Sequence, residues 1–169
     1  MSWKSKLRGR VWNLGGNVDT DQIFPGYAMA APADKFKEYA LAGSEIPDFA
    51  KKVQAGDIIV AGENFGCGSS REQATVALKE AGVGLVIAKS FARIFRRNAI
   101  NIGLPVLVCD LEQQVKNGQE IEVDLVSAEV TFCASGEKIS GTILASNVLE
   151  TLEAGGLIAK VRKQLGGRT

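Results

Sequence analysis

The chain has 169 residues, a formal net charge of +1, and 23% charged residues. This length suits one domain over residues 1–169 that buries its own core, and the balanced charge predicts binding neither to nucleic acid nor to an anionic membrane. The N-terminal segment lacks an apolar signal core and no apolar run is long enough to span a bilayer, which favours a cytoplasmic protein.

Strand and helix patterns alternate along the chain. The first third predicts a strand, an acidic turn, a strand end and a helix, at residues 10–12, 19–21, 23–26 and 33–41. The middle third predicts a strand at 57–62, a helix that ends before a cap at Gly82, a strand at 84–88, a helix at 91–101 and a strand at 105–108. The last third predicts a hairpin of 120–125 with 129–132, and a helix over 147–164 interrupted at Gly155-Gly156. A parallel core with an added antiparallel hairpin gives a mixed α/β class.

The predicted helix at 91–101 is basic. Helical spacing places Phe91, Ile94 and Phe95 inward and the three arginines of the helix elsewhere. This pattern favours a solvated or interface-facing helix over a nucleic-acid surface, and we expect the arginines to meet an acidic partner.

A glycine-rich turn, Gly66-Cys67-Gly68-Ser69-Ser70-Arg71, separates the strand at 57–62 from the following helix. The first amides of a helix lack intrahelical partners and attract anions, and Arg71 adds a planar fork that matches a carboxylate. The turn therefore predicts a carboxylate site. Walker and dinucleotide phosphate loops are excluded, because Gly66-Cys67-Gly68 stands where the first needs Gly-Lys-Ser/Thr, and Arg71 stands where the second needs glycine.

The two serines of this turn also have a structural interpretation. Ser69 with Glu72 and Ser70 with Gln73 both fit the spacing of a capping box. If Ser70 caps the helix, Ser69 remains beside the amides of residues 66–68, which can form an anion-binding nest. Ser69 is then the better candidate for chemistry.

Histidine is absent, and the three cysteines, Cys67, Cys109 and Cys133, are widely spaced. The sequence therefore contains no histidine-based triad, no disulfide framework and no metal-ligand pattern. Cys109 and Cys133 are typical of small core residues, and packing is also the preferred role of Cys67. Acid–base chemistry must use a carboxylate, a hydroxyl, a lysine or a group from another chain.

Four ordered segments, at 17–23, 56–72, 89–94 and 98–105, carry a family resemblance that extends over nearly the whole chain. They resemble the small subunits of 3-isopropylmalate dehydratase, the swivelling domain of the aconitase superfamily. The resemblance implies a β/β/α swivelling domain that closes over a separate large subunit carrying a four-iron four-sulfur cluster, with no cofactor on this chain. It implies a hydro-lyase of leucine biosynthesis that interconverts 2-isopropylmalate and 3-isopropylmalate by removing and re-adding water.

The same resemblance assigns roles to individual residues. It implies that Ser69, as an alkoxide, is the base that removes the proton from the carbon α to a carboxylate. It implies that Ser70 and Arg71 bind a substrate carboxylate, and that Asp21 lies at the edge of the site and orients an arginine or a hydroxyl. A free serine hydroxyl is a weak acid, so nearby amides, the helix terminus and Arg71 have to stabilise the alkoxide. Without the resemblance, Asp19 and Asp21 suit a solvated turn that caps itself.

The segment after the acidic turn departs from the family pattern. Isopropylmalate and homoaconitate enzymes usually show Tyr-Leu and a specificity pair that often includes arginine, whereas the loop here contains Tyr27, Ala28, Met29 and Ala30. Without a positive charge, a pocket lined by these residues suits an apolar γ-substituent better than a third carboxylate. Isopropylmalate is the preferred substrate, homoaconitate and citrate are disfavoured, and 2,3-dimethylmalate or another alkylmalate is the alternative. A non-catalytic swivelling domain that holds a carboxylate or phosphate is the alternative of another class.

Overall fold

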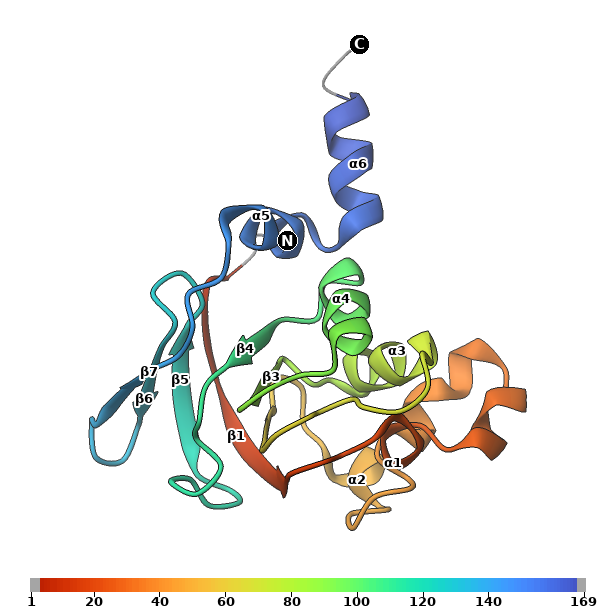
Figure 1. Ribbon diagram of the computed structural model, residues 1–169, viewed down its shortest axis with the longest axis horizontal. Coiled ribbons are helices and arrows are strands. Elements are labelled where there is room, and N and C mark those ends of the chain that lie inside the picture. The colour runs from red at the N-terminus through yellow and green to blue at the C-terminus, as the bar shows by residue number, and fades with distance from the viewer. Residues whose placement is uncertain (1–3, 167–169) are drawn as a thin grey trace.

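A seven-stranded sheet in the order β4-β3-β2-β1-β5-β6-β7 crosses the protein (Figure 1), whose computed structural model describes residues 4–166 of the predicted 1–169 domain. The parallel strands are β1 (Lys6–Gly15), β2 (Ile58–Ala61), β3 (Leu85–Ala88) and β4 (Val106–Val108). The antiparallel strands are β5 (Glu120–Asp124), β6 (Glu129–Phe132) and β7 (Lys138–Ser140). The predicted mixed α/β class is confirmed.

Strand β1 joins the two parts of the sheet. Its first half pairs antiparallel with β5, and its second half pairs parallel with β2 from Val11 opposite Ile58 onward. The strand is much longer than the predicted 10–12, because only Val11 in it is fully buried and the apolar alternation is therefore weak. Strand β7 was not predicted, because Ile139 is its one partly buried residue and lies between two exposed residues.

Six α-helices and two 3-10 helices connect or flank the described strands. Their bounds are α1 (Thr20–Ile23), η1 (Gly26–Ala30), η2 (Ala33–Tyr39), α2 (Phe49–Lys52), α3 (Glu72–Ala81), α4 (Arg93–Asn101), α5 (Ser146–Ala154) and α6 (Leu157–Gly166). The predicted break at Gly155-Gly156 is confirmed, and α6 projects from the body of the molecule (Figure 1). No helix within residues 4–166 is both long and apolar enough to cross a membrane.

Helix α4 begins later than predicted and turns a different face inward. Phe91 lies in the extended segment before the helix, where it forms an isolated bridge with Phe65. The face that enters the core carries Phe95 and Ala99, so Ile94 points outward with 44% of its surface exposed. The prediction that Ile94 faces inward is wrong, because it counted the helical phase from Phe91.

The parallel strands place four loops along one edge of the sheet. All residues of β2 and β3 are buried, which matches their continuous apolar sequences. Residues that follow the carboxyl ends of parallel strands are the usual location of ligand sites in such sheets. The acidic turn follows β1 and the glycine-rich turn follows β2, so the fold brings both motifs to this edge.

The three cysteines are free thiols. Cys109 is buried as predicted, and burial raises the pKa of its thiol above the ordinary value. Cys133 is only partly buried, so its predicted core position is not borne out. Cys67 is also partly buried and lies in the glycine-rich turn.

Candidate active site

Backbone hydrogen bonds join the acidic turn to the glycine-rich turn. The amide of Gly66 donates to the Val18 carbonyl at 2.7 Å, and the amide of Thr20 donates to the Cys67 carbonyl at 2.8 Å. Asp19 and Cys67 consequently form an isolated parallel bridge, a short extension of the β1–β2 pairing beyond the strands. The two motifs are therefore held in a defined register at the edge of the sheet.

The segment before α4 supports the glycine-rich turn from the other side. The amide of Phe65 donates to the Ser90 carbonyl at 3.0 Å, and the amide of Ala92 donates back to the Phe65 carbonyl at 2.9 Å. Gly66 has φ +83°, and a Cβ at this position would lie 2.2 Å from Cγ of Phe95. Glycine is required here both for the backbone conformation and for the close packing of the Phe95 ring.

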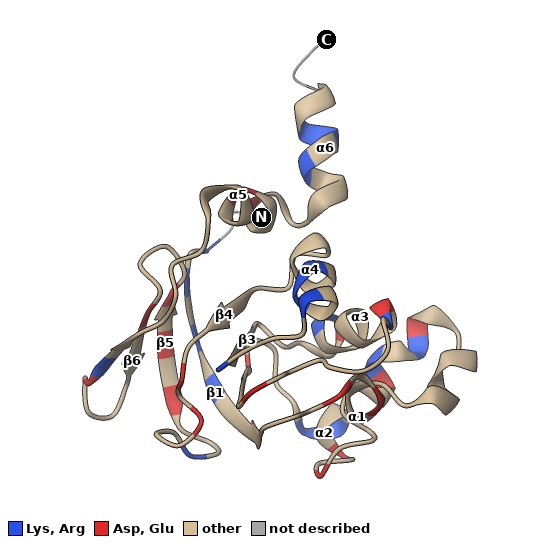
Figure 2. Cartoon of the chain, in the orientation of Figure 1, with Lys and Arg blue, Asp and Glu red and all other residues tan. Residues whose placement is uncertain are grey.

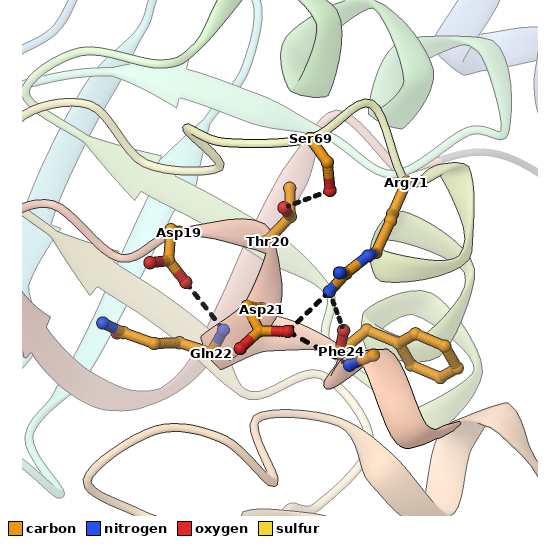
Figure 3. Close-up of polar contacts among 8 residues, drawn as sticks. Asp19, Thr20, Asp21, Gln22, Phe24, Ser69 and Arg71 are labelled. Carbon is orange, nitrogen blue, oxygen red and sulfur yellow. Dashed lines mark hydrogen bonds and ion pairs between the residues drawn. The ribbon is translucent and has the colours of Figure 1, made fainter. Parts of the chain in front are cut away.

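The hydroxyls of Ser69 and Thr20 are neighbours, with 3.2 Å between the two Oγ atoms (Figure 3). Thr20 is only 3% exposed, whereas Ser69 is exposed. A Cβ on Gly68, which has φ +105°, would lie 3.1 Å from the Thr20 hydroxyl oxygen. The buried Thr20 hydroxyl is thus within hydrogen-bond distance of the hydroxyl of Ser69, the proposed base. Thr20 lies within the predicted acidic turn but was not itself predicted as a site residue.

Neither serine caps α3. The residue at the N-cap is Arg71, and no side chain accepts a capping hydrogen bond there. The capping-box interpretation of Ser69 and Ser70 is therefore wrong, because the chain is still extended at Arg71 and the helix begins only at Glu72. Ser70 is exposed beside Ser69 and faces solvent at the same edge.

Arg71 reaches across to the acidic turn. Its Nη1 donates to Oδ1 of Asp21 at 2.8 Å and to the carbonyl of Phe24 at 3.0 Å (Figure 3). Nη2 and Nε make no hydrogen bond within residues 4–166, so this part of the guanidinium remains for another acceptor. The amide of Gly26 also donates to Asp21 Oδ1, at 3.1 Å. The bond from Arg71, followed by that from Gly26, holds the pKa of Asp21 below its ordinary value.

Asp19 caps α1. Its Oδ1 accepts a hydrogen bond from the amide of Gln22 at 2.8 Å, as Figure 3 shows. The turn therefore caps itself as the residue pattern alone suggested, but it opens a short helix and not the strand end predicted at 23–26. The spacing Asp-x-x-Gln resembles a capping box and is the sequence signal that would have identified this helix.

The predicted nest of three free amides is not present. The amide of Gly66 donates to Val18, and the amide of Cys67 donates to the carbonyl of Asn64 at 3.3 Å. Two of the three amides proposed at Gly66, Cys67 and Gly68 are therefore engaged within the chain. The cradle for an anion would have to come from Arg71, the serine hydroxyls and the Gly68 amide.

The predicted specificity loop forms η1, and its residues point in different directions. Tyr27 is 73% exposed and Met29 is 45% exposed, and Ala30 is exposed as well. Ala28 is only 1% exposed and packs in the core, so its prediction as a pocket-lining residue is wrong. The sequence also predicted that no positive charge reaches this loop, and this prediction is wrong. Nη1 of Arg71 donates to the carbonyl of Phe24, two residues before η1, and the same nitrogen pairs with Asp21.

The arrangement offers hydroxyls and a guanidinium but no metal site. No group of three or more His, Cys, Asp or Glu side chains within residues 4–166 could hold a metal ion. Iron–sulfur clusters need several thiolates, and Cys67 is the only cysteine in either turn. The residues present do not fit a cluster. They fit the binding of a carboxylate by Arg71 next to a hydroxyl that can exchange a proton.

The chain is similar to known proteins over almost its full length. The family model named aconitase C-terminal domain matches residues 17–112. The isopropylmalate/citramalate isomerase small subunit of Methanocaldococcus jannaschii is 48% identical over 96% of this chain and 97% of its own. The methanogen homoaconitase small subunit of Methanothermobacter thermautotrophicus is 50% identical over 90% of this chain and 88% of its own. The crystal structure of 3-isopropylmalate dehydratase from M. jannaschii superposes with a TM-score of 0.88 at 42% identity, over 95% of each chain.

Proposed function

This chain belongs to the family of 3-isopropylmalate dehydratase small subunits in the aconitase superfamily, and we propose that it is the small subunit of a hydro-lyase acting on isopropylmalate. The reaction interconverts 2-isopropylmalate and 3-isopropylmalate by dehydration and rehydration, a step of leucine biosynthesis. One observation carries the proposal. The acidic turn holds the Ser69 hydroxyl through Thr20 and the Arg71 guanidinium through Asp21, side by side at one edge of the sheet.

In this mechanism Ser69 exchanges the proton on the carbon next to a carboxylate. Arg71 binds that carboxylate through Nη2 and Nε, because Nη1 is held by Asp21 and Phe24. Ser70, exposed beside Ser69, adds a hydrogen bond to the same group. Thr20 can donate to the Ser69 oxygen, which stabilises the oxygen when it carries negative charge. These contacts orient the substrate so that its C–H bond meets the serine oxygen.

The active enzyme needs a second chain. Ser69 and Ser70 are exposed, and catalysis of this kind requires a site closed to water. A large subunit carrying the four-iron four-sulfur cluster completes the site in our proposal. When bound there, the cluster supplies Lewis-acid chemistry for the departing hydroxyl. Within residues 4–166 no group of three or more His, Cys, Asp or Glu side chains could hold a metal ion, so the proposal assigns the cluster to the partner.

The substrate is proposed to carry an apolar group where homoaconitate carries a third carboxylate. A relative named as a homoaconitase subunit is 50% identical, so overall identity does not decide between these substrates. The cation next to η1, Arg71, pairs with Asp21 through Nη1, and in the proposed mechanism its other nitrogens bind the carboxylate next to the reacting carbon. The exposed side chains of η1 are Tyr27, Met29 and the small Ala30. A third carboxylate would therefore lie near η1 without a cation of its own.

Met29→Arg tests this choice. We expect the variant to fold normally, because Met29 is 45% exposed. The added guanidinium should reduce kcat/KM for isopropylmalate by about tenfold and raise it for substrates with an additional carboxylate. Met29→Gln is the control, since it changes polarity without adding charge. If the ratio of the two rates does not move in Met29→Arg, η1 does not set specificity.

Reconstitution tests the function as a whole. The chain is mixed with its cognate large subunit, and hydration of the dehydrated intermediate is measured by its ultraviolet absorbance. We expect activity only in the mixture.

Ser69→Ala should lower kcat by about 10²–10⁴-fold with little change in KM, because the hydroxyl acts in proton transfer. Ser70→Ala is the matched control and should mainly raise KM. A silent Ser69→Ala with an inactive Ser70→Ala would exchange the two roles, and an inactive wild-type mixture would refute the function.

A further inference from the structure

Helix α4 exposes an arginine patch that the mechanism does not use. Arg93 and Arg97 lie one turn apart and are exposed. Ile94, which follows Arg93 in the sequence, has 44% of its surface exposed. Helical geometry places Arg97 at the centre of this face, with Arg93 on one side and Ile94 on the other. Figure 2 shows the positive charge on α4. We refer to Arg93, Ile94 and Arg97 as the α4 patch.

The arginines of the α4 patch have no ion-pair partner within residues 4–166. Some exposed cations elsewhere in the described chain pair with carboxylates, as Lys52 does with Asp48 at 2.8 Å and Lys138 with Glu129 at 3.2 Å. Helix α4 itself contains no acidic residue. Two like charges one turn apart destabilise a helix, so folding of this chain alone does not account for the pair.

The start of α4, which carries Arg93, lies at the same edge of the sheet as the glycine-rich turn. The segment that enters α4 is hydrogen-bonded to Phe65, and the Phe95 ring on the inner side of α4 packs against Gly66. Ser69 follows Gly66 by three residues, and Arg93 follows Ser90 by three residues. A chain that covers Ser69 from the solvent side therefore also approaches the start of α4.

We propose that the α4 patch is a docking surface for an acidic region of the large subunit, with Arg97 as its central contact. The inference rests on the proposed function for the identity of the partner. The composition fits, because interface centres are enriched in arginine beside apolar side chains, and such residues carry much of the binding energy. Because the α4 patch is positively charged, the complementary surface on the partner is negatively charged. The net charge of +1 and the small extent of the patch favour a protein partner over nucleic acid.

Arg97→Glu tests the docking surface. The dissociation constant for the cognate, cluster-loaded large subunit is measured by analytical ultracentrifugation or calorimetry at low and high salt. We expect Arg97→Glu to weaken association about tenfold or more at low salt, and Arg93→Glu to act in the same direction. The salt dependence of the wild-type affinity should become shallower in the variant. Circular dichroism and thermal melting of the isolated chain establish that the variant folds.

Arg162→Glu on α6 is the matched control, since Arg162 is also exposed and the change in net charge is identical. Equal weakening by Arg162→Glu, or wild-type affinity in Arg97→Glu, would overturn the proposal. If a random RNA oligomer binds the wild-type chain and Arg97→Glu abolishes this binding, the patch is assigned to nucleic acid and the docking proposal is overturned as well.

The proposed function and the docking surface can fail separately. A wild-type pair that associates through the α4 patch but does not hydrate the intermediate refutes only the function, and an active pair that ignores Arg97→Glu refutes only the docking surface.

Discussion

Two arginine–aspartate pairs in this protein have opposite exposure. In the pair of Arg10 and Asp57, the aspartate side chain is 5% exposed and the arginine side chain is 36% exposed. In the pair of Arg71 and Asp21, the arginine is 20% exposed and the aspartate is 70% exposed. The first pair anchors a buried carboxylate. The second pair orients a recessed guanidinium with a carboxylate in water, where solvent weakens the attraction. Arg71 is therefore held in place and can still bind a second carboxylate.

The network around Asp57 belongs to the scaffold. Besides Arg10, its Oδ2 accepts hydrogen bonds from Nε1 of Trp12 at 2.8 Å and from the amide of Gln54 at 2.9 Å. The Trp12 ring packs edge-on against Phe49 and lies under the Arg10 guanidinium. Nε of Arg10 is buried without a hydrogen-bond partner, so part of the desolvation cost of this arginine is not recovered.

Asp57→Ala is the largest expected effect and separates the two pairs by stability. Removing the carboxylate leaves the Trp12 and Gln54 donors without an acceptor and Nη2 of Arg10 with the Lys52 carbonyl alone, so we expect the free energy of unfolding to fall by about 3 kcal/mol. The melting temperature should fall by about 6–12 °C, measured by calorimetry on the isolated chain. Asp21→Ala is the control and should shift the melting temperature by less than about 2 °C, since Asp21 is exposed. Equal shifts in the two variants would mean that the buried network is not the stronger anchor.

Arg71→Lys separates the pairs by activity. Lysine keeps the positive charge but loses the planar fork that binds Asp21 and a substrate carboxylate together. Because a hydrogen bond to a charged group contributes about 1.5–3 kcal/mol, kcat/KM of the reconstituted enzyme should fall roughly 10- to 100-fold, mainly through KM. Arg10→Lys is the matched control and should leave kcat/KM of the folded enzyme unchanged. A normal KM in Arg71→Lys would remove Arg71 from substrate binding.

The elements that sequence patterns predicted well are those with uniform burial. Strands β2 and β3 are buried at every position, and their continuous apolar runs identified them correctly. The break between α5 and α6 was also predictable, because Gly155 has φ +92° and Gly156 has φ +131°. By contrast, β1 is only partly buried along most of its length, so its pattern revealed only the centre.

The geometry of the site depends on long-range contacts that no local pattern encodes. The resemblance singled out Ser69, Arg71 and Asp21, but not the contact of Ser69 with Thr20, 49 residues earlier in the sequence. Local capping spacing pointed instead to a helix start at the serines, and the tertiary contacts of the turn overrode it. The catalytic and binding roles of these residues stay predictions until the variants are measured.

The smallest expected effect concerns the titration of Asp21. Hydrogen bonds from Arg71 and from the Gly26 amide hold its pKa below the ordinary value, so the carboxylate stays charged to lower pH than an isolated aspartate. A carboxyl group whose pKa is lowered by folding stabilises the protein above its unfolded pKa of about 3.9, and this contribution is lost as the pH falls through the lower folded pKa. The pair between Asp21 and Arg71 should thus persist at every pH above about 4.

NMR titration of the Asp21 carboxyl carbon in the isolated chain measures this pKa directly. Arg71→Gln should raise the pKa, because it removes the largest cause of the shift, but only part of the way, because the Gly26 amide still donates to Oδ1. The same titration in Arg10→Gln is the control and should leave Asp21 unchanged, since Arg10 pairs with Asp57. If Asp21 titrates identically in the wild type and in Arg71→Gln, the ion pair is not formed in solution. Arg71 would then reach the active site without a carboxylate to orient it, and the distinction between the two pairs would fail.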